Sequence, residues 1–327
     1  MTAPQALAPQ ALAPRRLIAL GARGPEDVVA DARGRVLTGV EDGRILRLDG
    51  LTNPAGGPRV EVLARTGGRP LGLELLPGDD TLLVCDAERG LLRVDLASGA
   101  VHVLTDTLAR ERLRFCSNVV ALSDGSVYFT VSSTRYPLRQ WIGDLVEHTG
   151  TGRLLRLAPG ASVPEVVLDG LQFANGLAPA ADESFLVVAE TGARRLTRVP
   201  LTGPSVGQAH PFAENLPGMP DNLWRGGPDG PIWVALAGPR VPPLDLLHRA
   251  APAVRRAAAR AAVHAPFRPT GTTGVLAYDD QGRALHHLTA RHSRFRMATS
   301  VCEASGLLVL GSLWERGVAV CERPAVK

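Results

Sequence analysis

Four oxygen-bearing side chains of this 327-residue chain are candidates for binding a metal ion. Glu26 lies in "GPEDVVAD", Asn118 in "FCSNVVAL", Asn175 in "FANGLAPA" and Asp221 in "LPGMPDN". Each precedes or opens a short apolar run of the kind that forms β-strands. Two carboxylates and two amides are ligands that a calcium ion accepts, with water or a substrate oxygen completing its coordination.

Taken singly, these residues have an ordinary structural explanation. Asn175 is followed by glycine and Asp221 by asparagine, and both pairs are common in turns because Asx side chains bond to nearby backbone. The interpretation as ligands therefore depends on the four residues occupying equivalent places in a repeated unit, which would bring them together.

The chain does contain a repeated unit, in which two short apolar strands are separated by a polar turn. Two copies read "GRVLTGVEDGRILRLDG" and "DTLLVCDAERGLLRVDLASG". The six copies begin near Gly34, Asp80, Gly125, Glu183, Gly230 and Gly306. The first intervals are about 46 residues, the length of a four-stranded propeller blade. The pattern predicts an all-β fold, a six-bladed β-propeller, whereas a sandwich or a simple barrel predicts no repeat of this size.

In a propeller, the innermost strand of every blade runs along a central channel. Glu26, Asn118, Asn175 and Asp221 are expected at the start of the innermost strands of the first, third, fourth and fifth blades, and should meet at one mouth of the channel. The second and sixth innermost strands are expected to begin near Arg69 and Met297.

The predicted domain organisation is an Ala/Pro-rich disordered arm over residues 1–16 and a single propeller over residues 17–327. Two insertions, at about 134–149 and 239–270, interrupt the repeat and are expected to be helical. Long insertions in compact domains are usually functional covers, so a lid over one end of the propeller is expected. The basic amphipathic stretch 244–263 also permits contact with a membrane surface, and we favour the lid.

Composition narrows the range of functions. The chain carries 36 Lys and Arg against 32 Asp and Glu, and only 4% aromatic residues, so it lacks the clustered basic and aromatic surface typical of nucleic-acid binding. The N-terminus has neither the basic start nor the apolar core of a secretory signal. The four cysteines show no zinc-site spacing. A cytoplasmic protein acting on a small molecule is expected, with no prediction of oligomeric state.

The segments "GPEDV", "CDAERGLLRVD", "LQFANGLAPAADESFLVVAET" and "LPGMPDNLW" resemble the strictosidine synthase-like branch of six-bladed propellers. The superfamily also includes gluconolactonase, paraoxonase and diisopropylfluorophosphatase, and the resemblance is greatest to its adipocyte plasma membrane-associated members. It extends from about residue 24 to residue 320. By this resemblance, Glu26, Asn118, Asn175 and Asp221 fall on calcium-holding positions, with one ion in the central tunnel.

The resemblance also implies an activity, the hydrolysis of lactones, aryl esters and organophosphates, in which the metal polarises the reacting oxygen. Asp221 and Glu26 are then the candidate catalytic carboxylates. The chain departs from its hydrolytic relatives at Val119, where an acid is common, and at Leu71, where paraoxonases have a histidine. Thr299 stands where strictosidine synthase has its glutamate, which argues against amine-aldehyde condensation in the same form.

The candidate substrate pocket comprises Leu71, Tyr136, Trp141, His148 and Thr299, from the channel mouth and the first insertion. We predict a calcium-dependent lactonase or arylesterase acting on a small, largely apolar ester or lactone. Two alternatives remain open at this point: a propeller that binds a small molecule without turnover, and a strictosidine synthase-like biosynthetic enzyme with altered chemistry.

Overall fold

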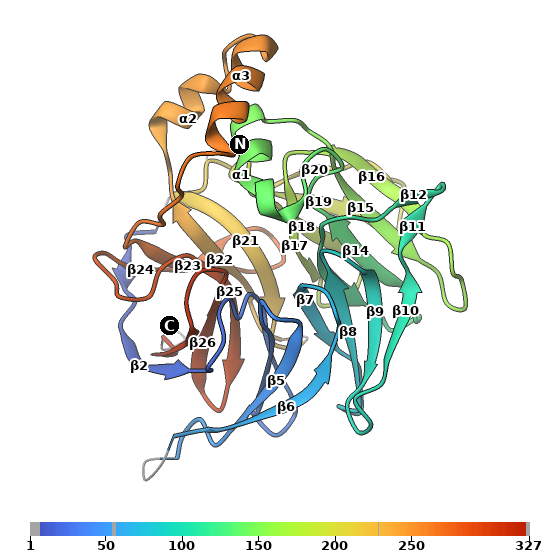
Figure 1. Cartoon of the computed structure of the whole chain (residues 1–327), viewed down its shortest axis with the longest axis vertical. Coiled ribbons are helices and arrows are strands. Elements are labelled where there is room, and N and C mark those ends of the chain that lie inside the picture. Colours follow the sequence, from blue (N-terminus) through green and yellow to red (C-terminus); the bar gives the residue numbers. More distant parts are fainter. Residues whose placement is uncertain (1–6, 54–56, 228, 325–327) are drawn as a thin grey trace.

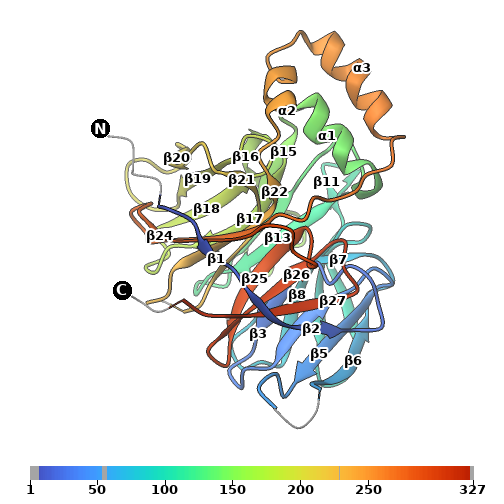
Figure 2. The same ribbon diagram turned by 90° about the vertical axis from the view of Figure 1, so that its left-hand side faces the viewer.

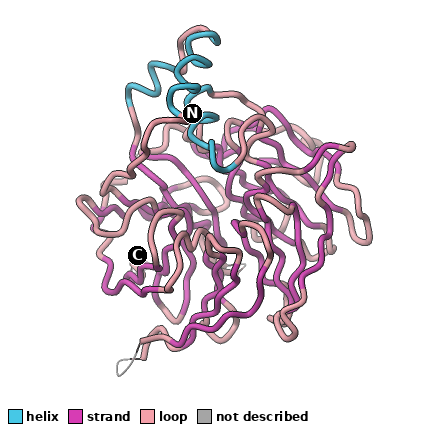
Figure 3. Tube along the Cα trace, in the orientation of Figure 1, coloured by secondary structure: helices cyan, strands magenta, loops and turns pink. Residues whose placement is uncertain are grey.

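The computed structural model describes residues 7–53, 57–227 and 229–324, and its strands form six sheets arranged around one axis (Figure 1). The predicted six-bladed β-propeller is therefore confirmed. Apart from two N-terminal strands, which join the outer edges of two sheets, the strands of each sheet follow one another in sequence and pair antiparallel, from the axis outward. Figure 3 shows that strand dominates the whole body of the molecule and that helix is confined to one end.

The blades have the following strands. Blade 1 contains β3 (Val28–Ala30), β4 (Val36–Gly39), β5 (Arg44–Asp49) and β6 (Arg59–Arg65). Blade 2 contains β7 (Pro70–Leu75), β8 (Thr81–Asp86), β9 (Gly90–Asp95) and β10 (Val101–Thr105). Blade 3 contains β13 (Cys116–Ala121), β14 (Val127–Val131), β15 (Gly152–Leu157) and β16 (Glu165–Leu171). Blade 4 contains β17 (Ala174–Pro179), β18 (Phe185–Glu190), β19 (Arg195–Pro200) and β20 (His210–Ala213). Blade 5 contains β21 (Gly218–Arg225), β22 (Ile232–Pro239), β23 (Thr273–Tyr278) and β24 (Ala284–Ala290). Blade 6 contains β25 (Ala298–Ala304), β26 (Leu307–Ser312) and β27 (Gly317–Glu322). A small hairpin of β11 (Thr107–Leu108) and β12 (Glu111–Arg112) follows blade 2.

The innermost strands β3, β7, β13, β17, β21 and β25 contact one another around the axis. Glycine allows this close approach: a Cβ on Gly72 would lie 2.4 Å from the Cα of Asn118, and one on Gly176 would lie 2.3 Å from the backbone nitrogen of Leu223. Farther out, apolar side chains of neighbouring blades pack between the sheets, as Leu46 of blade 1 and Val309 of blade 6 do in one cluster. The six innermost strands thus hold the channel at a fixed width.

The N-terminal segment differs from the expectation of a disordered arm over residues 1–16. Residues 1–6 lie outside the described part, but β1 (Gln10–Ala11) pairs with β24, and β2 (Pro14–Ala19) pairs antiparallel with β27. The second pairing supplies the fourth strand of blade 6 and so joins the two ends of the chain in one sheet. Without β2, the outer edge of β27 would have unpaired backbone groups. An Ala/Pro-rich composition does not reveal that β27 needs this partner strand.

Both insertions carry helix, as predicted, and stand together at one end of the propeller (Figure 2). The first, between β14 and β15, contains the short 3-10 helix Leu138–Gln140 and α1 (Trp141–Glu147). The second, between β22 and β23, contains α2 (Pro242–Leu247) and α3 (Pro252–Ala262). Helices α1 and α3 contact each other. None of the described helices is long and apolar enough to span a bilayer.

Candidate metal centre

An irregularity of strand pairing recurs on the innermost strands at the level of the candidate ligands. The register of the innermost strand shifts around Asn118 in blade 3, Asn175 in blade 4 and Asp221 in blade 5. Blades 2 and 6 show the same shift around Leu71 and Thr299. A β-bulge releases a residue from the regular ladder and re-aims its side chain. The repeated unit therefore places Leu71, Asn175, Asp221 and Thr299 at one level in the channel, and in blade 3 the neighbour of Asn118, Ser117, lies at that level.

A cavity of about 310 Å³ lies between this level and the helical insertions. Its floor contains Glu26, Asn175 and Asp221, and its walls and roof are apolar. The apolar lining includes Leu71, Phe115, Leu138, Trp141, Ile142, Leu145, Phe173, Met219, Leu244, Phe267, Met297 and Leu313. The predicted lid is thus a roof made by both insertions over a polar floor, the usual composition of a small-molecule site.

The floor is a hydrogen-bonded set of buried polar side chains. Asn222 donates from Nδ2 to Oε1 of Glu26 over 3.0 Å, and Thr299 donates from Oγ1 to the Glu26 carbonyl over 2.6 Å. Asn175 accepts from Oγ of Ser117 over 3.1 Å and donates to Oγ1 of Thr191 over 3.2 Å. The second carboxylate oxygen of Glu26, Oε2, is buried and has no hydrogen-bond partner.

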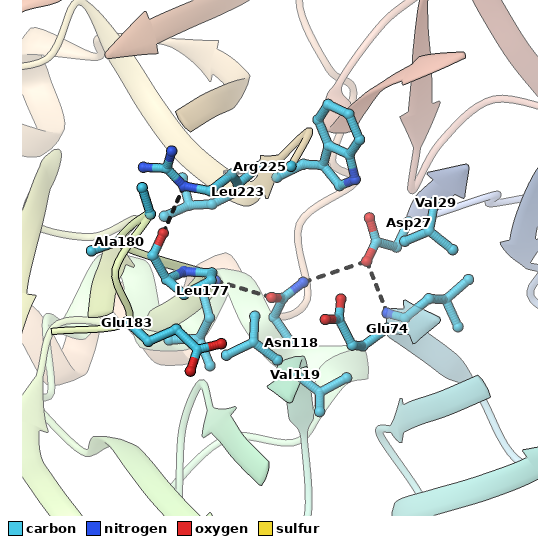
Figure 4. A pocket seen from close by; sticks show the side chains of 16 residues that line it. Asp27, Val29, Glu74, Asn118, Val119, Leu177, Ala180, Glu183, Leu223 and Arg225 are labelled. Atoms are coloured by element: carbon cyan, nitrogen blue, oxygen red, sulfur yellow. Dashed lines mark hydrogen bonds between the residues drawn. The ribbon is translucent and has the colours of Figure 1, made fainter. Parts of the chain in front are cut away.

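Asn118 belongs to the same network but faces the other way along the channel. Its Nδ2 donates to Oδ1 of Asn222 over 3.1 Å and to Oδ2 of Asp27 over 3.4 Å, while its Oδ1 accepts from the Leu177 amide over 3.0 Å. Figure 4 shows these bonds, with Glu74 beside Asp27, around a second cavity of about 270 Å³. The four predicted ligands are therefore brought into one polar layer, with Asn118 on its far side.

Little positive charge lies near the carboxylates of this layer. Burial raises the pKa of Glu26 well above its usual value, and the carboxylates of Asp221 and Asp27 raise it further, while Arg69 opposes them. Burial raises the pKa of Asp221 to about 8, against a hydrogen bond from Asn175, and that of Asp27 to about 7. Buried carboxylates are costly unless a proton or a cation neutralises them.

The floor fits a calcium ion by the chemistry of its donors. Glu26 and Asp221 supply two carboxylates, one with the unpartnered oxygen Oε2, and Asn175 supplies an amide oxygen with a second lone pair. Within the described residues, no three His, Cys, Asp or Glu side chains gather as a metal site. The carboxylate and amide oxygens of this floor suit a hard cation better than a zinc ion, which prefers nitrogen and sulfur ligands.

The predicted pocket residues separate into two groups. Leu71, Trp141 and Thr299 line the cavity over the floor. Tyr136 and His148 are not among its lining residues: Tyr136 donates its hydroxyl to Glu147 over 2.5 Å, and His148 ends helix α1. Both lie in the first insertion, but their side chains contact other residues of the roof. Sequence position alone does not reveal these contacts.

His148 joins the two halves of the roof. Its ring stacks on that of His248, which follows α2, with ring centroids 4.0 Å apart and planes at 18°. His248 is within hydrogen-bonding distance of the Leu145 carbonyl, 2.7 Å from Nε2, and Arg255 of α3 donates to the His148 carbonyl over 3.2 Å. Burial lowers the pKa of His148 to about 4, with His248 and Arg255 acting in the same direction and Glu190 opposing.

This junction predicts that acid loosens the roof. The pKa of His148 is lower in the folded protein than in the unfolded chain, so its contribution to stability is present above about pH 6.5 and is lost as the pH falls toward 4. The hydrogen-exchange protection factors of residues 239–263, which are corrected for the intrinsic effect of pH on exchange, should fall more between pH 7.5 and 5 in the wild type than in His148→Asn. Asparagine tolerates the left-handed backbone at this position (φ 58°) and does not titrate.

His210→Asn, at an exposed histidine of β20, is the matched control and should keep the wild-type response. An equal response in His148→Asn and the wild type would show that the histidine pair does not govern the roof.

The structure adds site residues that the sequence did not single out. Asn222, Ser117 and Thr191 complete the hydrogen bonding of the floor, and Asp27 bonds to the backbone amides of Val28 and Leu73 beneath it. Asp27, Ser117 and Asn222 each adjoin a predicted ligand in the chain. Their position next to a predicted ligand is the only sign in the sequence that these three residues belong to the site. Alternation along a regular strand would point their side chains away from the channel.

Comparison with known proteins gives consistent results. Residues 118–204 match the family model for strictosidine synthase, and residues 8–48 match the model for the N-terminal part of strictosidine synthase-like proteins. The chain is 32% identical over 297 residues to strictosidine synthase-like protein 6 of Arabidopsis thaliana, covering 89% of this chain and 76% of that protein. It is 34% identical to the adipocyte plasma membrane-associated protein of Rattus norvegicus, covering 70% of this chain and 62% of the relative. The matches span 55–62% of the length of the rat, salmon and zebrafish proteins of that name.

Solved structures share the fold at low sequence identity. A gluconolactonase of Xanthomonas campestris superposes with a TM-score of 0.65 at 19% identity, over 98% of this chain and 97% of that one. A calcium-binding regucalcin of Agrobacterium tumefaciens superposes with a TM-score of 0.63 at 15% identity, over 98% of this chain and all (100%) of the other. These likenesses establish the propeller architecture alone.

Proposed function

Because the chain belongs to the strictosidine synthase-like family of six-bladed propellers, we propose that it is a calcium-dependent hydrolase of a small, largely apolar ester or lactone. One observation carries the proposal: Glu26 and Asp221, two buried carboxylates with raised pKa values, form the floor of an apolar cavity closed by two helical insertions. The fold alone does not support this activity, because related propellers host different activities.

Each part of the site has a role in this proposal. Glu26 and Asp221 hold the ion, Asn175 orients Asp221 through its hydrogen bond, and Thr299 fixes the backbone of Glu26. A bound calcium ion would polarise the carbonyl oxygen of the substrate. The apolar walls take the acyl or aryl group and exclude water from the floor. Asp221 is the carboxylate placed to act on the substrate or on an attacking water molecule.

The proposal is tested by assaying purified protein with phenyl acetate and with simple γ- and δ-lactones, in calcium and in chelator. We expect hydrolysis in calcium, its loss on chelation and its recovery on adding calcium back. Hydrolysis that is indifferent to chelation would contradict the role of the metal.

A second candidate function is small-molecule binding without turnover. It is favoured by the scarcity of proton-transfer groups, since Glu26, Asp221 and Arg268 are the only ionisable side chains among the described residues lining the cavity. Calcium binding accompanied by ligand binding, with no hydrolysis of any ester or lactone, would support this candidate over the first.

Trp141→Ala should impair hydrolysis of bulky aryl esters. Trp141 of α1 lines the cavity and packs edge-to-face on Phe267 of the second insertion, with ring centroids 4.9 Å apart, so it closes the roof between the two halves. Losing this contact and its apolar wall should lower kcat/KM for a naphthyl ester by about tenfold, the equivalent of ~1.4 kcal/mol. Phenyl acetate, which fills less of the cavity, should be affected less.

Trp224→Ala is the matched control, because Trp224 lines the cavity at the opposite end of the channel. Thermal melting of both variants identifies any general loss of stability. Equal losses of kcat/KM in the two variants would show that the roof has no specific role in substrate binding.

A further inference from the structure

The second insertion carries the excess positive charge of the protein. Residues 239–270 contain six arginines and one aspartate, whereas the entire chain has an excess of only four positive charges. The rest of the chain is therefore close to neutral in formal charge. Figures 1 and 2 both show α2 and α3 projecting beyond the propeller body at one end of the molecule.

Most of these six arginines make no ion pair within the described residues. Asp245, the one acid of the segment, is paired with Arg194 over 2.8 Å and with Arg240 over 2.5 Å. Arg255 turns inward to the His148 carbonyl. By contrast, Arg249, Arg256 and Arg260 are exposed, and they form no ion pair with any acid of the described residues. We call these three residues the roof arginines.

Exposed apolar side chains lie on the same two helical segments as the roof arginines. Helix α3 packs its Ala259 and Val263 side toward α1 and leaves Val254, 52% exposed, on the opposite side of the helix. Leu246 of α2 is 71% exposed. Arg256 and Arg260 are four residues apart on α3, where like charges repel and destabilise an isolated helix. This combination stabilises nothing within the fold.

We propose that the outer side of α2 and α3 binds an anionic lipid surface. A projecting helix pair with unpaired arginines and separate exposed aliphatic side chains fits the interfacial mode, in which arginines contact headgroups and apolar side chains enter the boundary region. Nucleic acid would be attracted by the same charges, but Leu246 and Val254 offer it no stacking surface.

The proposed lipid-binding surface of α2 and α3 lies close to residues that line the cavity. Val241 and Phe267 line the cavity and are also substantially exposed, at 39% and 37%, and they flank the same helices. The entrance to the cavity therefore lies next to the lipid-binding surface. An apolar ligand dissolved in the bilayer would reach the cavity without crossing bulk water. The lipid contact itself does not depend on the proposed hydrolysis.

The test is co-sedimentation of the full chain with vesicles of phosphatidylcholine alone and of phosphatidylcholine with about 30% phosphatidylserine. We expect strong preference for the anionic vesicles, weakening as salt rises. Substituting all three roof arginines by glutamine should lower the partition coefficient about a hundredfold, since each arginine near such a surface contributes about fivefold. Leu246→Ser with Val254→Ser should weaken binding while preserving its salt dependence.

The control is a second triple substitution, Arg65→Gln, Arg110→Gln and Arg114→Gln, at exposed arginines of the propeller body with the same change in net charge. It should reduce binding only slightly. Equal binding to both kinds of vesicle, equal losses in the two triple variants, or binding to nucleic acid in place of vesicles would each overturn the proposal. Because all six arginines are exposed, circular dichroism should show intact folding in both variants.

Discussion

Asp221→Asn should lower the affinity for calcium by a factor on the order of 10³, and Glu26→Gln should do the same. Each substitution removes one of the two carboxylates on the cavity floor, in surroundings where water cannot replace the lost charge. Hydrolysis of phenyl acetate should disappear in both variants. Calorimetric titration with calcium measures the affinity, and the ester assay measures the activity.

Glu74→Gln is the matched control. Glu74 is also a carboxylate in the channel, and burial raises its pKa to about 8, but it lines the cavity on the opposite side of the polar layer. Its substitution should leave calcium affinity within about threefold of the wild type. Wild-type affinity in Asp221→Asn, or a loss in Glu74→Gln as large as in Glu26→Gln, would place the ion elsewhere.

Stabilisation by calcium should grow as the pH rises from 5 to 8. The pKa values of Asp27 and Asp221 are about 7 and 8 in the folded protein, well above those of an unfolded chain, and that of Glu26 is raised as well. The metal-free protein therefore binds these protons more tightly when folded. Their contribution to stability is complete below about pH 4 and is lost as the pH rises through 7 and 8.

Calcium replaces the lost protons, so the difference in Tm between calcium and chelator should be small at pH 5 and should reach several degrees at pH 8. A free-energy difference of a few kcal/mol, at about 2 °C per kcal/mol for a protein of this size, gives that range. The difference between the two melting curves cancels titrations unrelated to the metal. A Tm difference that is constant or falls with pH would contradict the electrostatic account of the floor.

Much of the fold was predictable because the repeated unit is visible in the sequence. Gly34 and Asp80 begin successive copies of one pattern, and the structure confirms one blade for each. Once the blades are counted, the innermost strands follow, and with them the shared level of Asn175 and Asp221 in the channel, whereas in blade 3 it is Ser117, next to Asn118, that lines the same cavity.

The features of the site that the sequence does not predict depend on the direction in which side chains point. Asn118 lies on an innermost strand, as its sequence pattern predicts, yet the hydrogen bond from the Leu177 amide holds its oxygen on the far side of the polar layer. Such a bond between blades has no signature in either segment. His148 belongs to the insertion over the cavity, but its partner His248 lies a hundred residues later in the sequence.

Amide side chains, and not further acids or histidines, orient the carboxylate of Glu26 on the floor. Val119 and Leu71 occupy positions where hydrolytic relatives are expected to have an acid and a histidine, and both are buried apolar residues here. Asn222 bonds to Glu26, and Asn118 bonds to Asn222, so amides rather than acids orient the floor. The proposed binding of a metal ion by Glu26 and Asp221 would depend on this orientation, and hydrolysis would follow from that binding.

The most direct test of this account is a crystal structure of the protein grown with calcium. A single strong peak is expected on the cavity floor, about 2.3–2.6 Å from carboxylate oxygens of both Glu26 and Asp221. A floor filled only by water at saturating calcium, or an ion held by other side chains, would contradict it.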